Sequence, residues 1–290
     1  MGQGFYHTSH KENHLLYAKA MIQKKTYLRS CFAALCLLML ASCGDSDDED
    51  LTVKNEPPEQ IYREARALFV EKNYKKAIEQ FEEVERQYPY SEWAPRAEIQ
   101  AAYSAYLSNK YDDAVDILDR FVRLHPTHKS APYAYYLRGL CYYDQITDVG
   151  RDQKTTELAQ KALRDVITRF PDSEYAQDAK LKLDLTNDHL AGKEMEIGRY
   201  YLKQQEYIAA INRFKTVVEK FDTTTHVPEA LHRLTEAYLR LGIVSEAKKY
   251  AAVLGYNYPG SEWYKYSYEM IKGNLSPEER KSGWKKWFTL

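Results

Sequence analysis

The chain has 290 residues, enough for two or three ordinary domains or for one repeat array. Only 12 glycines and 10 prolines, with 29% charged residues, favour helices over sheets. A formal net charge of −1 gives no overall field that would attract nucleic acid, and a mean hydropathy of −0.64 excludes a polytopic membrane protein.

Residues 21–42 have the pattern of a secretory signal, with a basic start followed by an apolar core of about 10 residues, too short to span a bilayer. Ala41 and Ser42 then precede Cys43, as in a bacterial lipobox, where the cysteine is lipidated and becomes the first residue. We therefore predict that Cys43 is the lipidation site and that residues 1–20 are a mis-called N-terminal extension. The alternative is an ordinary signal peptide cut nearby, with Cys43 incidental.

Residues 43–58 predict a disordered tether, because their acidic residues repel one another and Pro57-Pro58 stiffens the end. Clustered acids can bind calcium, but neither a glycine nor a terminal bidentate glutamate follows at the required spacing. Beyond Cys43 the mature chain keeps one cysteine, Cys141, so no intrachain disulfide is expected. We expect Cys141 to be a small buried hydrophobe.

A short motif recurs along the rest of the chain: QYPYSEWAP, LHPTHKSAP, RFPDSEYAQ and NYPGSEWYK, at 87–95, 124–132, 169–177 and 257–265. Each follows a segment with helical spacing of small and large apolar residues, and Pro ends that helix. In the fourth of the five segments Asp222 takes the place of the proline. The common register predicts core positions at Ala77, Phe81 and Val84; Ala114, Leu118 and Phe121; Ala159, Leu163 and Val166; Ala210, Phe214 and Val217; and Ala247, Ala251 and Leu254.

Small residues upstream complete a two-helix unit, because they let a first helix cross the second closely. They are Ala65, Ala102, Gly139, Gly198 and Thr235. The pattern resembles the tetratricopeptide repeat, so we predict an all-α fold, a solenoid of about five such helix pairs.

The units group into two halves. Residues 59–172 form an N-terminal three-repeat half, and residues 173–272 form a C-terminal two-repeat half that begins with a long linking helix ending near residue 203. Residues 273–290 form a C-terminal tail.

The sequence offers no catalytic motif. It contains no phosphate-binding glycine loop, HExxH, CxxC pair or GxSxG turn, so we expect no enzyme, no metal and no cofactor. His125 and His128 lie in one inter-repeat turn, but a zinc site would need further ligands nearby.

A peptide-binding surface is the better candidate, because the first helices of such repeats line a concave groove. Aromatic rings there can hold the apolar side chains of an extended peptide, and Arg66 can pair with a carboxylate. The alternative is that many of these tyrosines pack between helices, and we expect about half to face the groove. The predicted substrate-peptide groove consists of Tyr62, Arg66, Phe69, Tyr103, Tyr106, Tyr133, Tyr136 and Tyr143.

Three segments give the chain a more specific resemblance: FVRLHPTHKSAPYAYYLRGLCYYDQI, DVGRDQ and KEMEIGRYYLKQQEYIAAINRF. With the lipobox, acidic tether and repeats, they resemble the BamD family of outer-membrane lipoproteins. The resemblance covers residues 40 to about 272.

The BamD resemblance implies an adaptor on the periplasmic face of the outer membrane, held there by its lipid. Its partners would be the POTRA domains of BamA, other assembly-machine lipoproteins and unfolded outer-membrane proteins, whose C-terminal signal would enter the groove. Arg213, in the INRF stretch, matches a family position in the half that faces BamA, and is carried over as an interface residue. The alternative function is an envelope repeat lipoprotein serving cell-wall or division enzymes.

Overall fold

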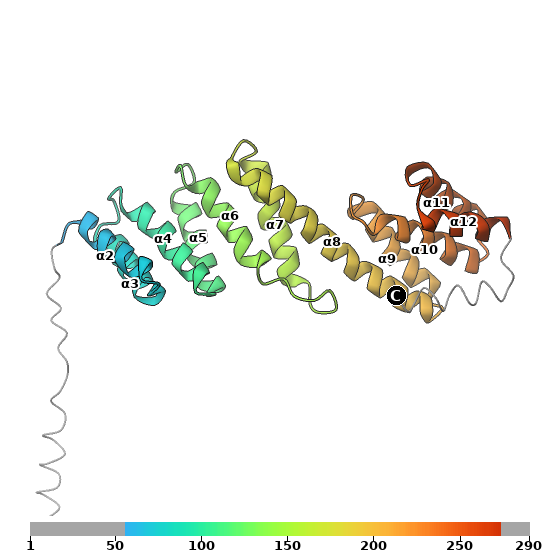
Figure 1. Ribbon diagram of the computed structural model, residues 1–290, viewed down its shortest axis with the longest axis horizontal. Coiled ribbons are helices and arrows are strands. Elements are labelled where there is room, and N and C mark those ends of the chain that lie inside the picture. The colour runs from blue at the N-terminus through green and yellow to red at the C-terminus, as the bar shows by residue number, and fades with distance from the viewer. Residues whose placement is uncertain (1–55, 274–290) are drawn as a thin grey trace, which may run out of the picture. The chain divides into compact units, whose positions relative to one another are not determined.

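The computed structural model describes residues 56–273, so Cys43, most of the tether and all but one residue of the tail lie outside the described part. Within residues 56–273 the chain forms eleven helices and no strand. In chain order they are α2 (Pro58–Val70), α3 (Tyr74–Gln87), α4 (Ala94–Leu107), α5 (Tyr111–Leu124), α6 (Ala131–Tyr143), α7 (Lys154–Arg169), α8 (Glu174–Lys203), α9 (Tyr207–Lys220), α10 (Val227–Arg240), α11 (Val244–Asn257) and α12 (Glu262–Lys272) (Figure 1).

These helices form antiparallel pairs, each packed on the next. The pairs are α2–α3, α4–α5, α6–α7, α8–α9 and α10–α11, and α12 packs on α10 and α11. The first helices also touch one another, α2 with α4, α4 with α6, and α6 with α8. This arrangement confirms the all-α solenoid of five helix pairs expected from the repeats.

Every core position predicted from the repeat register is buried. The small residues of the first helices allow the close crossings. A Cβ atom added at Gly198 would lie 2.5 Å from Cε1 of Phe214, and one added at Gly139 would lie 3.0 Å from Cδ2 of Leu163. The crossing at Gly198 leaves no room for a Cβ atom, whereas at Gly139 the end of the Leu163 side chain would have to shift.

The second helices end in the same way whether or not proline follows. The residue after each has φ between −126° and −134°, and its backbone N–H donates to a carbonyl four residues earlier. Helix α9 ends like the others although Asp222 replaces the proline. A ring-bearing residue directly after the helix, here Phe221, is therefore a better marker of the helix end than proline. These terminal residues are Tyr88, His125, Phe170, Phe221 and Tyr258.

Helix α8 is the predicted long helix. Its 30 residues span about 45 Å at 1.5 Å per residue. It packs on α6 and α7 through residues such as Ala179, and on α9 through residues such as Met195. Among residues 56–273, no helix combines the length and the apolar character needed to cross a bilayer.

Candidate functional site: an aromatic face and a polar cleft

Aromatic side chains from α2 and α4 lie in a row. The Phe69 ring centroid lies 5.9 Å from that of Tyr103, and Tyr103 lies 6.2 Å from Tyr106 in a nearly parallel arrangement. All three are half-buried, each with one side on the hydrophobic core. Three predicted groove residues are therefore brought together at spacings typical of favourable ring pairs.

The row continues on α6 and α8 through a residue that sequence reasoning missed. The Tyr175 ring lies 5.4 Å from Tyr133 and stacks on Tyr136 at 5.3 Å. Tyr133 packs against the same hydrophobic core as Tyr103 and Tyr106, which places the two groups of rings on one continuous part of the fold. Burial, then the nearby Tyr103 and Tyr175, raise the pKa of Tyr133. We call the six residues Phe69, Tyr103, Tyr106, Tyr133, Tyr136 and Tyr175 the aromatic face.

The missed residue has a sequence signal, because the turns repeat SEW or SEY. Trp93, Tyr175 and Trp263 occupy the same position, and each packs on the first helix of the preceding pair. Trp93 lies 5.0 Å from Tyr62, and Trp263 lies 5.2 Å from His232. The aromatic of this motif therefore joins successive first helices.

Two tyrosines of the aromatic face donate their hydroxyl protons to carboxylates of the following pair. Tyr106 donates to Asp144 at 2.5 Å, and Tyr136 donates to Asp178. Burial first, then these acidic partners, raise the pKa of both tyrosines, so the phenols stay neutral. The hydrogen bonds from Tyr136 and Lys182 lower the pKa of Asp178, which stays a carboxylate.

The other predicted groove residues lie outside the row. Tyr62 packs between helices, with its ring centroid 5.5 Å from that of the buried Phe81. The Lys182 ammonium lies over the Tyr143 ring, 5.5 Å from its centroid. Arg66 is exposed, with its guanidinium 5.8 Å from the Phe69 centroid and within 3.4 Å of Gln100 Oε1.

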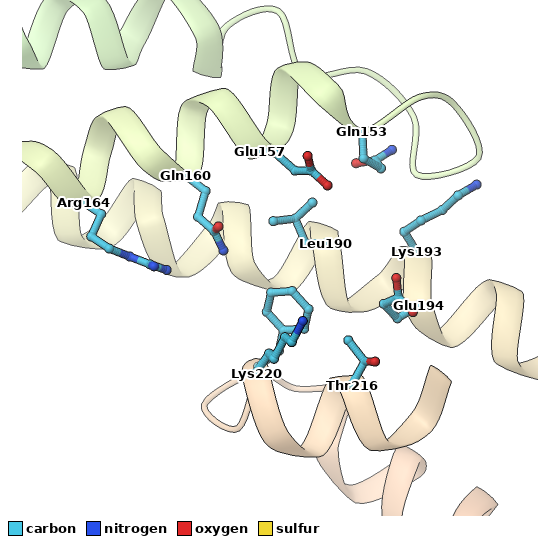
Figure 2. Close-up of a pocket in the computed structure, with 10 residues that line it drawn as sticks. Gln153, Glu157, Gln160, Arg164, Leu190, Lys193, Glu194, Thr216 and Lys220 are labelled. Atoms are coloured by element: carbon cyan, nitrogen blue, oxygen red, sulfur yellow. The ribbon is translucent and has the colours of Figure 1, made fainter. Parts of the chain in front are cut away.

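A polar cleft of about 600 Å³ opens where α7 and α9 lie on either side of α8. Figure 2 shows Glu157, Gln160 and Arg164 of α7 on one side, Thr216 and Lys220 of α9 on the other, and α8 between them. Leu190 and Phe221 supply apolar parts of the lining.

Arg213, the predicted interface residue, lies beside this cleft. Its guanidinium is 3.2 Å from the carboxylate of Glu194, a lining residue of α8, and its side chain is 42% exposed. Sequence reasoning missed Glu194, because the pair forms only where α8 crosses α9.

Residues 56–273 contain no group of three or more His, Cys, Asp or Glu side chains that could hold a metal ion. Cys141 is fully buried, and burial raises its pKa to about 12, so its thiol is unreactive at neutral pH.

Most of the chain matches a known protein family. Residues 54–254 match the family model YfiO, described as an outer membrane lipoprotein. The outer membrane protein assembly factor BamD of Caulobacter vibrioides is 48% identical over 243 residues, covering 83% of this chain and 80% of that protein. The same factor of Rickettsia prowazekii is 47% identical over 86% of this chain and 98% of its own length.

Solved structures are more distant. A thermophilic tetratricopeptide-repeat protein of Thermus thermophilus aligns with a TM-score of 0.35 at 19% identity, over 74% of this chain and 98% of the other. The sequence relatives, in contrast, cover more than four fifths of this chain, and they favour outer-membrane assembly over cell-wall or division work. The chain therefore belongs to the BamD family of outer-membrane protein assembly factors and is a non-catalytic member of that assembly.

Proposed function

We propose that this chain receives the C-terminal signal of unfolded outer-membrane β-barrel proteins on its aromatic face. The observation that carries the proposal is the set of six half-buried rings contributed by four successive first helices. Such rings offer apolar area with little conformational freedom to lose on binding. The barrel substrates of this family typically end in an aromatic residue. Such a C-terminal segment matches that surface.

The arrangement suits an extended segment. Alternate side chains of a β-strand project to the same side about 6.6–6.8 Å apart, close to the ring spacings of the face. One face of a barrel strand is apolar, so successive apolar side chains can contact successive rings. The carboxylates of Asp144 and Asp178 can accept hydrogen bonds from backbone N–H groups that are unpaired before the barrel closes.

Replacing Tyr103 and Tyr136 together with Ala should weaken binding of a peptide that carries a barrel's last strand by about tenfold or more, since each ring contact contributes about 0.5–1.5 kcal/mol beyond its area. Fluorescence anisotropy with a labelled peptide measures the affinity. Tyr90→Ala is the control, because Tyr90 is fully exposed in an inter-helix turn. Equal affinity in the double variant and the wild type would place the peptide elsewhere.

We further propose that the polar cleft and Arg213 dock on the periplasmic POTRA domains of BamA. The exposed Arg213 can share its guanidinium between Glu194 and a partner carboxylate, since it has donors for both. The mixed charges of the cleft walls suit a polar, separable interface.

Arg213→Glu should therefore reduce the affinity for purified POTRA domains by about tenfold or more, because it places two carboxylates side by side and repels the partner's acid. Surface plasmon resonance at two salt concentrations measures the loss. The matched control is Arg123→Glu on α5, an exposed arginine remote from the cleft lining. A control loss as large as that of Arg213→Glu would count against this dock.

Lipidation of Cys43 completes the proposal. The family description as an outer membrane lipoprotein supports it, and an anchor on the periplasmic face would hold both surfaces near the barrel substrates. Membrane fractionation of Cys43→Ala tests the anchor, since continued pelleting would show that other contacts retain the protein.

A further inference from the structure

The two ends of the aromatic face differ in charge. At the α2 end, Arg66 is exposed beside Phe69, and within residues 56–273 its contacts are the Phe69 ring and the neutral amide of Gln100. No carboxylate among those residues neutralises it. This end therefore presents a cation with free hydrogen-bond donors next to an aromatic ring.

The α6 and α8 end is acidic. Asp144 and Asp178 hold the hydroxyl groups of Tyr106 and Tyr136, and Lys182 lies 2.9 Å from Asp178. Lys182 offsets one of the two negative charges, which leaves the pair with a net negative charge. Because both tyrosine protons are already donated, this end offers mainly hydrogen-bond acceptors.

The C-terminal carboxylate of a bound peptide would be favoured at one end of the aromatic face and disfavoured at the other. Next to Arg66 it gains a charge-assisted, potentially bidentate hydrogen bond. Next to Asp144 and Asp178 it meets like charges at short range, which is unfavourable. Backbone N–H groups have the opposite preference, since the acceptors lie at the acidic end.

We propose that the aromatic face binds the C-terminal segment of an unfolded barrel in one direction, with its terminal carboxylate on Arg66 and its last aromatic side chain on Phe69 and Tyr103. The preceding residues run over α4 and α6 towards Asp144 and Asp178. The inference rests on the proposed function of this face and assigns Arg66 as the residue that reads the chain end.

The first test compares two synthetic peptides of the same alternating apolar and polar sequence, both ending in Phe, one as the free acid and one as the C-terminal amide. The wild-type protein should bind the acid about tenfold more tightly at low salt, as expected for one charge-assisted contact. Arg66→Gln should bind both peptides with the affinity that the wild type has for the amide. Arg63→Gln, an exposed arginine on the same helix, is the matched control and should keep the preference.

The second test reads the direction from crosslinks. A photo-reactive group next to the peptide's C-terminus should label α2 or α4, and one several residues upstream should label α6 or α8. The reverse pattern, or equal affinity for acid and amide with Tyr103 and Tyr136 still required, would overturn the direction and leave the proposed function standing. If neither peptide binds, the proposed function fails and the direction fails with it.

Discussion

Replacing Arg233 with Met should lower the free energy of unfolding by about 3–5 kcal/mol, the range for removing one partner of a buried ion pair. Arg233 on α10 is 1% exposed, with its Nε 3.3 Å from Glu229 and its Nη1 3.0 Å from Glu236. Its guanidinium also lies 5.4 Å from the centre of the Trp263 ring, which joins α12 to α10. Methionine has similar volume but removes the buried cation from Glu229 and Glu236, which keep only the more exposed Arg199 and Arg240 as partners.

Urea unfolding followed by circular dichroism measures the effect of Arg233→Met. Arg240→Met is the matched control, because Arg240 also pairs with Glu236, at 3.8 Å, but its side chain is 35% exposed. This substitution should lower the free energy of unfolding by about 1 kcal/mol or less. Adding Glu236→Gln to Arg233→Met should recover part of the loss, because it removes one of the two carboxylates that have lost their buried partner. Equal losses in the two single variants would contradict the account of a buried charge cluster.

Gly198→Leu should be the second large effect, with a loss of about 1–3 kcal/mol or more, as overpacking a dense crossing requires. The new Cβ alone would lie 2.5 Å from the ring of Phe214, a fully buried residue of α9 that cannot move aside. Helices α8 and α9 would have to separate, exposing apolar surface of both. The thermal unfolding midpoint of the purified variant reports the loss.

Gly260→Leu is the control for this crossing. A Cβ atom at Gly260 has nothing within 4 Å, so the same change there should alter stability by about 0.5 kcal/mol or less. If Gly198→Leu unfolds at the wild-type temperature, the two helices are not held at the distance that the structure gives.

The repeat register could be predicted from sequence because it depends on spacing within each helix. Residues such as Phe81 and Val84 must lie on one helical face, and that face had to be buried. The small residue at 198 was recognisable for the same reason, since each unit has one at the corresponding place. Helix ends are less well explained by the sequence: proline predicts the end of each second helix, whereas α9 ends at the same point with Asp222 following.

The candidate sites were only partly predictable, because their contacts join distant helices. Spacing put Tyr106 and Tyr136 on first helices, but the acids that accept their protons lie 38 and 42 positions further along the chain. The position of Tyr62 between helices likewise depends on Trp93 of the next unit. The helix crossings decide which rings face solvent. These crossings cannot be predicted from the spacing of residues within one helix.

One helix contributes to both proposed binding surfaces. Helix α8 carries Asp178 beside the aromatic face and Glu194 beside Arg213. The two residues are sixteen positions apart, which corresponds to about 24 Å along one continuous helix. A displacement of α8 at one site is thus transmitted to the other without crossing a flexible joint. If cargo and docking domain each favour a different position of this helix, linkage requires that each change the affinity for the other by the same factor.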